Sequence, residues 1–284
     1  MLNKQALKNI HSLAKESESL WPVSLKATLK IHWQKTINDD KNGLISMLSI
    51  FLWQDSANNK NITLSDVYYL SVAELYFWTA ANLEDDLSDD ENVARNYLPL
   101  LSSCRDLAWH YIYKAILKHK HINSSLIIAL LLKVHAGNFK ELSANKNIPN
   151  EPISAAAKSI FLLVGPIIIA NILKWNKNEQ AQLFIAGKYF LAAKQLADDV
   201  YDYQEDWSAG KRTFAHYKLN KPPNKQELPA YYQQQAKNIL YLCQKSKQEL
   251  KKITTLKKRD CFTYFLKPLE LNCLETLTKL SNRP

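Results

Sequence analysis

Two runs of aspartates repeat the pattern DDxxD at distant positions in the chain, and each follows a largely apolar stretch. The first run is Asp85, Asp86 and Asp89, and the second is Asp198, Asp199 and Asp202. Carboxylate oxygens suit Mg²⁺, which keeps open positions for water and substrate phosphate when few protein ligands bind it. The two runs therefore predict divalent-cation sites for a phosphorylated substrate.

The spacing within each run predicts a shared helix face, because residues four apart project from the same side of a helix. Asp85 would then lie beside Asp89. In the second run a stripe extends over two turns, through Asp198, Asp202 and Asp206. Two like charges 4 Å apart repel by about 4 kcal/mol where the effective dielectric constant is about 20. Folding alone does not offset this repulsion, whereas bound cations would.

Neither run fits the other common ion or phosphate motifs. Both lack the glycine and the glutamate of a calcium-binding EF-hand loop, and the chain contains no Gly-rich phosphate-binding loop. Metal ions together with Lys and Arg side chains would therefore have to hold the phosphate.

The elements that position the aspartates are predicted to be long helices. The chain of 284 residues has only five glycines, and its apolar residues recur at i, i+3 and i+4. The first run would lie on a helix that begins with a capping box of Thr63 and Asp66 and continues toward Asp85. The second would lie on a helix that begins within 176–180 and reaches about Asp206. We therefore predict an all-α fold in a single domain, residues 1–284.

The composition limits which binding partners and which cellular compartment are expected for the protein. Lys and Arg outnumber Asp and Glu by 37 to 27, but the basic residues are scattered and no nucleic-acid motif is present. A phosphorylated small molecule and a peripheral contact with a membrane remain open, and no nucleic-acid partner is expected. The N-terminus lacks the apolar core of a signal peptide, and the four cysteines form no CxxC pair, so a cytoplasmic protein is expected. The most apolar run, 159–173, contains Gly165-Pro166 and is shorter than the roughly 20 residues that span a bilayer.

Over about residues 63–215 the sequence resembles the class I isoprenoid synthases. The resemblance rests on the two DDxxD runs and on Gln195, which precedes Asp198 by three as in the QxxDD of trans-polyprenyl diphosphate synthases. It implies a helical bundle in which the two acid motifs face each other across a deep central cavity. Three Mg²⁺ ions would bridge the motifs to a prenyl diphosphate, whose ionisation leaves an allylic carbocation in a dry aromatic pocket.

The resemblance also implies roles for residues at matching positions. Metal ligation would fall to Asp85, Asp89, Asp198 and Asp202 as the catalytic set, supported by Asp86, Asp199 and Asp206. Diphosphate would be bound by Arg95, Lys158, Gln195 and Lys211. The chain differs from the elongating enzymes in having Ala94 in place of an arginine and no GKxxR motif for isopentenyl diphosphate.

The type of reaction is left open by the motifs. The stretch QLADDVYDYQEDWSAGK also resembles the squalene and phytoene synthases, with Asp202 and Asp206 at their two acidic positions and Gly210-Lys211 in place of Gly-Arg. Prenyl transfer is the leading expectation. A terpene synthase or cyclase, which ionises one substrate, is the alternative, and an inactive regulatory subunit is a further one. A homodimer is usual in similar enzymes.

Helix geometry adds an expectation about chain length. Residues four, five and eight before Asp85 would line the cavity below the metal ions, and they are Ala81, Ala80 and Phe77. The two alanines leave the first turn open, and Phe77 would form the floor one turn deeper. The pocket is therefore expected to hold a substrate or product longer than farnesyl (C15).

Overall fold

The computed structural model describes residues 2–57, 59–89, 94–120, 151–208, 213–216, 218–257 and 262–281, with isolated positions between these ranges. The described residues form helices and turns, and among them there is no strand beyond an isolated β-bridge between Ser56 and Leu256. The prediction of an all-α fold is confirmed.

The chain forms two compact units, each with its own helices. Unit 1 comprises Met1–Leu130, Phe161–Asn176 and Thr255–Lys257, and unit 2 comprises Leu131–Ile160, Lys177–Thr254 and Lys258–Pro284. The first acid run belongs to unit 1 and the second to unit 2. That the chain is one domain stays a prediction.

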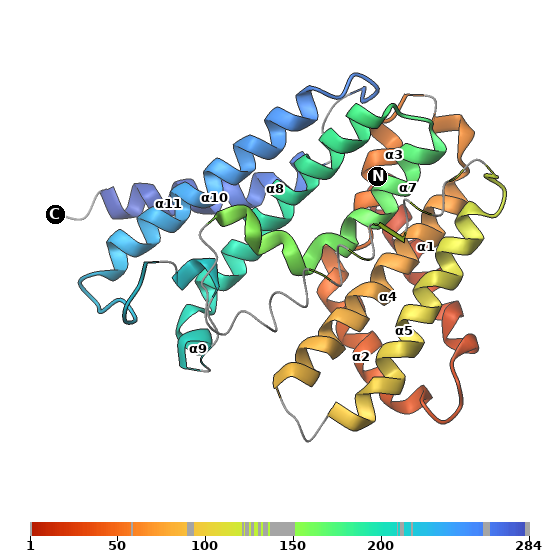
Figure 1. Ribbon diagram of the computed structural model, residues 1–284, viewed down its shortest axis with the longest axis horizontal. Helices are drawn as coiled ribbons and strands as arrows, with labels where there is room; N and C mark the ends of the chain where they lie inside the picture. Colours follow the sequence, from red (N-terminus) through yellow and green to blue (C-terminus); the bar gives the residue numbers. More distant parts are fainter. Residues whose placement is uncertain are drawn as a thin grey trace. The chain divides into compact units, whose positions relative to one another are not determined.

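Unit 1 is built around one long central helix, α4. Its helices are α1 (Leu2–Glu16), α2 (Lys26–Asp39), α3 (Leu48–Asp55), α4 (Leu64–Asp89), α5 (Ala94–Ile116) and α7 (Val164–Ile172). Short 3-10 helices η1 (Ser17–Leu20), η2 (Asp40–Asn42) and η3 (Asn59–Asn61) connect them. Helices α1, α2, α3, α5 and α7 all contact α4, and α5 runs beside it (Figure 1).

The start of α4 is set by the predicted capping box. The Thr63 Oγ1 accepts a hydrogen bond of 3.2 Å from the backbone N–H of Asp66, and the Thr63 N–H donates to Asp66 Oδ2 at 3.3 Å. Two backbone donors of the first turn are thereby satisfied without other helices. The predicted helix from Thr63 toward the first acid run is confirmed.

The middle of α4 is fixed against α1 and α2 by aromatic and hydroxyl side chains. The ring of Tyr76 is fully buried and stacks on Trp33 of α2 with centroids 4.2 Å apart. Its hydroxyl accepts a hydrogen bond of 2.9 Å from Trp21 Nε1. One turn further on, the hydroxyls of Thr79 and Thr36 lie 2.8 Å apart. Tyr76 therefore belongs to the core of unit 1.

A buried carboxyl group lies at the contact of α4 with α3 and α7. Glu74 is 1% exposed, and Ser49 Oγ donates a 2.7 Å hydrogen bond to its Oε1. Burial raises the pKa of Glu74 well above its ordinary value, more than the hydrogen bond from Ser49 lowers it. Helix α7 approaches so closely at Gly165 that a Cβ there would lie 2.2 Å from Glu74 Oε1 and from Ser49 Oγ. Only glycine fits this approach without a shift of the neighbours.

The apolar run 159–173 is shared by two elements. Its first residues end η4 (Pro152–Leu163), and the rest form α7, in whose first turn Gly165 and Pro166 lie. Nearly all of these side chains are buried. Among the described helices, none contains an apolar stretch long enough to cross a bilayer.

Unit 2 is built from α8 (Lys177–Tyr201), α9 (Tyr203–Ser208), η5 (Phe214–His216), α10 (Leu228–Lys251) and α11 (Thr263–Ser281). Helix α10 contacts both α8 and α11. Phe190 of α8 and Phe262 stack with centroids 5.2 Å apart, and Ser246 Oγ of α10 donates a 2.9 Å hydrogen bond to the carbonyl of Ala186. These contacts hold the helix that carries the second acid run.

The described cysteines are buried free thiols. They are Cys104, Cys243 and Cys273. Burial is the main cause that raises the pKa of each. Cys261 lies outside the described residues.

Candidate active site

The first acid run ends α4, and its two described aspartates differ in surroundings. Asp85 is exposed. Asp86 is half-buried, and its Oδ2 lies 3.9 Å from Nδ1 of His32 on α2. Consecutive residues of a helix project about 100° apart, so Asp85 points in a different direction from Asp86, which faces α2. Asp89 is the last residue of α4. Its backbone is described, but its side chain is not.

His32 is itself held between two helices. Its ring meets Tyr97 of α5 edge to face, with centroids 5.0 Å apart. Burial lowers the pKa of His32; Asp86 raises it and Lys35 lowers it, both by less. The imidazole is therefore neutral at neutral pH.

The residues expected to line the pocket lie one to two turns before Asp85. Ala81 is half-buried, and Ala80 is 3% exposed. Phe77 is 7% exposed and contacts Phe161 with ring centroids 6.3 Å apart. This part of unit 1 is apolar and aromatic, and the prediction that Phe77 forms the floor of a substrate pocket stays a prediction.

The second acid run keeps helical register across the junction of α8 and α9. The N–H of Asp202 donates to the carbonyl of Asp198 at 3.0 Å, and the N–H of Asp206 donates to the carbonyl of Asp202 at 3.0 Å. The predicted spacing of these three aspartates over two turns is thus present. Lys194 Nζ, one turn earlier on α8, lies 2.5 Å from Asp198 Oδ1. Asp202 is exposed and Asp206 half-buried.

A second face of the same helices is buried. Asp199 is 6% exposed, and its Oδ1 accepts a 2.8 Å hydrogen bond from Nε2 of Gln195. Tyr203, four residues after Asp199, is 3% exposed. Asp206 follows three residues later. This i, i+4, i+7 spacing places the three residues on the face of α8 and α9 that is turned toward α10.

Two tyrosines of α10, Tyr231 and Tyr232, cover that face beside Tyr203. The ring centroids of Tyr203 and Tyr231 lie 5.2 Å apart, and those of Tyr231 and Tyr232 lie 5.4 Å apart. The buried hydroxyl of Tyr231 has no hydrogen-bond partner among the described residues. The pKa of Tyr231 is raised, chiefly by burial. Tyr232 and Tyr203, and then the charges of Asp199 and Asp206, raise it further. The hydroxyl therefore stays protonated close to these carboxylates.

Three of the predicted diphosphate ligands have no described side chain. Arg95 lies in the first turn of α5 and Lys158 in η4, with backbones but not side chains described. Lys211 lies outside the described residues entirely. The side chain of Gln195 is described, and its amide donates the hydrogen bond to Asp199 given above.

Sequence reasoning missed three neighbours of the aspartates. The spacing of Lys194 and Asp198, four residues apart on a helix, is itself a signal for an ion pair. His32 and Tyr231 are distant in sequence from the acids they approach, and no spacing rule links them. Only the packing of α2 on α4 and of α10 on α8 brings them close.

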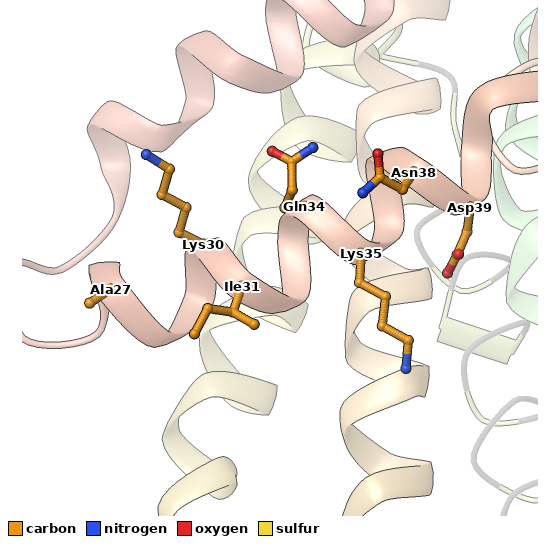
Figure 2. A pocket seen from close by; sticks show the side chains of 7 residues that line it. All are labelled: Ala27, Lys30, Ile31, Gln34, Lys35, Asn38 and Asp39. Atoms are coloured by element: carbon orange, nitrogen blue, oxygen red, sulfur yellow. The ribbon is translucent and has the colours of Figure 1, made fainter.

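Among the described side chains, no three of His, Cys, Asp or Glu converge closely enough to hold a metal ion. A surface depression of about 570 Å³ lies elsewhere in unit 1, along the outer side of α2. Its lining includes Ala27, Lys30, Ile31, Gln34 and Lys35, all from this one helix (Figure 2). None of the predicted site residues lines this depression.

No family model matches this chain, and no curated protein matches it.

Proposed function

We propose that the protein is a Mg²⁺-dependent enzyme of the class I isoprenoid synthase type, which ionises an allylic prenyl diphosphate and transfers the prenyl group. The observation that carries this proposal is the helical register of Asp198, Asp202 and Asp206. It aligns carboxylates along the consecutive helices α8 and α9 at a spacing that folding alone does not favour. A similar run, with Asp85 exposed, ends α4 in unit 1.

The donor set fits a hard divalent cation. The candidate ligands are carboxylate oxygens, and the exposed groups Asp85 and Asp202 can be reached from solvent. Asp198 already contacts a cation, the Lys194 ammonium, so its carboxylate accepts a positive neighbour. Few protein ligands would leave coordination positions for water and diphosphate. Mg²⁺ bound there would stabilise the negative charge that develops on the leaving diphosphate.

The chain's own residues would perform the remaining tasks. The rings of Phe77, Trp78 and Phe161 form apolar surface that would exclude water, and their faces would stabilise a carbocation.

A direct assay tests the proposal. Purified protein with Mg²⁺ is given geranyl, farnesyl or geranylgeranyl diphosphate, and released pyrophosphate and organic products are measured. Release that needs isopentenyl diphosphate indicates chain elongation, whereas a hydrocarbon or alcohol from one diphosphate alone indicates a terpene synthase.

The matched variants are Asp202→Asn in the second run and Asp106→Asn, an exposed aspartate of α5. Asp202→Asn is expected to lower the rate by about 100-fold, the usual effect of removing one electrostatic contact to the transition state. Asp106→Asn should leave the rate unchanged. No release from any of the three diphosphates would overturn the proposal.

A further inference from the structure

Among the described large apolar side chains of unit 1, the two most exposed belong to α2 and the turn before it. Val23, in the turn before the helix, is 92% exposed, and Ile31 is 69% exposed. Leu20, just upstream, is 49% exposed. Ala27 and Ile31, four residues apart on α2, share one helix face, and both line the depression described above. Such a group of exposed apolar side chains is a signal for an interaction surface.

Lysines surround these apolar side chains. Lys26, Lys30 and Lys35 are all exposed on α2. Figure 2 shows Lys30 and Lys35 extending from different sides of the helix, with Ile31 between them, and all three line the depression. The nearest acid on this helix, Asp39, is at its last residue. The surface, defined by Val23, Lys26, Lys30, Ile31 and Lys35 and called here the α2 surface, is therefore positive and partly apolar.

This combination selects one kind of partner. Lysine is depleted in the centre of protein–protein interfaces, so a second copy of the chain is a poor match for a surface with three lysines among two apolar residues. An anionic bilayer matches both features, because its headgroups attract ammonium groups and its interface accepts apolar side chains to a shallow depth. Lysine stems can also lie along the apolar region while the charges stay in water.

We propose that the α2 surface docks the protein on the surface of an anionic lipid bilayer. Val23 and Ile31 enter the interface, and Lys26, Lys30 and Lys35 bind the headgroup charges. The docking is peripheral and reversible, since a few side chains supply it. It goes beyond the proposed function and does not depend on it, because the surface contains none of the residues assigned to the reaction.

The test is cosedimentation of the full chain with vesicles of phosphatidylcholine alone or with 30 mol% phosphatidylglycerol, at about 0.1 M salt. Binding is expected only to the anionic vesicles and should weaken as salt rises, because ions screen the headgroup charges. Val23→Ser with Ile31→Ser should lower the vesicle affinity by about 10-fold. Lys26→Gln, Lys30→Gln and Lys35→Gln together should lower it at least as much.

Matched controls separate this surface from the overall positive charge. Lys177, Lys237 and Lys251 are exposed in unit 2, and their triple change to Gln gives the same net charge as the α2 triple. Leu271 and Leu274 of α11 are each 51% exposed, and their change to Ser matches the apolar variant. Both controls should bind vesicles as the wild type does. All variants are compared by circular dichroism and thermal unfolding to confirm the fold.

Three outcomes would overturn the proposal. The first is no binding to anionic vesicles. The second is an equal loss of binding in the unit 2 lysine control, which would assign the attraction to net charge alone. The third is self-association of the wild type, seen by light scattering, that disappears with Val23→Ser and Ile31→Ser, which would make a second copy the occupant.

Discussion

The Oδ2 of Asp86 lies 3.9 Å from Nδ1 of His32, so the second aspartate of the first acid run faces α2. Its neighbour Asp85 is exposed. The two adjacent carboxylates of one motif thus have different surroundings, and the difference divides their expected roles. Asp85 can be reached from solvent, and Asp86 lies against a neighbouring helix.

The two aspartates should therefore differ in their contribution to activity. Asp85→Asn is expected to lower the rate of pyrophosphate release by about 100-fold. Asp86→Asn should lower it by less than about 10-fold, since its carboxylate is turned toward His32. Steady-state rates at saturating Mg²⁺ measure both. Equal losses in the two variants would show that Asp86 ligates the ion as directly as Asp85.

Lys194 is expected to compete with the cation for Asp198. An ion pair four residues apart on a helix contributes about 0.3–0.5 kcal/mol, and Asp198 is 48% exposed, so the competition is weak. Lys194→Gln should therefore lower the Mg²⁺ concentration for half-maximal activity by about two-fold. Lys237→Gln, at an exposed lysine of α10, is the control and should leave it unchanged. A higher Mg²⁺ requirement in Lys194→Gln would contradict this role.

Tyr231→Phe is expected to stabilise the protein. The Tyr231 hydroxyl is buried without a partner among the described residues, and a buried donor left unpaired costs about 1–3 kcal/mol. Removing it should raise the free energy of unfolding by up to about 1 kcal/mol, because part of that cost is recovered. Urea unfolding measures the change. A clear loss of stability would mean that the hydroxyl has an acceptor, such as an ordered water.

Glu74 should make stability fall as the pH rises. Burial raises its pKa well above 4.5 in the folded protein, while the unfolded chain keeps the ordinary value. Above pH 4.5 the unfolded chain therefore loses a proton that the folded protein keeps, and the unfolded state is favoured by up to about 1.36 kcal/mol per pH unit. The effect stops once the pH exceeds the folded pKa.

The difference between wild type and Glu74→Gln isolates this group. Urea unfolding at several pH values above 4.5 should show the wild type losing stability relative to Glu74→Gln as the pH rises. Glu205→Gln, at an exposed glutamate of α9, should give no such trend. Parallel pH profiles for wild type and Glu74→Gln would rule out a raised pKa.

Ala81 offers a test of the expected pocket. It lies one turn before Asp85 on α4 and is half-buried. If the chain of the substrate passes this position, Ala81→Phe should shorten the longest diphosphate that is accepted or formed, and Ala81→Val should have a smaller effect. Chromatography of the products measures chain length. An unchanged product with Ala81→Phe would place the pocket elsewhere.

The sequence was sufficient where the determining interactions are local. The capping box of Thr63 and Asp66, the helix that follows it, and the register from Asp198 to Asp206 depend on neighbours within four residues, and all were predicted. The environment of each carboxylate was not predicted. Asp199 and Asp86 are placed by contacts with α10 and α2, and a spacing pattern within one helix carries no information about which other helix will cover it.

The first acid run lies at the C-terminal end of α4. Aligned peptide dipoles already leave about half a negative charge at the end of a helix, so Asp85 and Asp89 add charge where the backbone disfavours it. The last turn of α4 is therefore less stable than its capped first turn. A cation bound there would offset this negative charge and stabilise the last turn. Amide hydrogen exchange in the residues just before Asp89 should therefore slow when Mg²⁺ and pyrophosphate are added together.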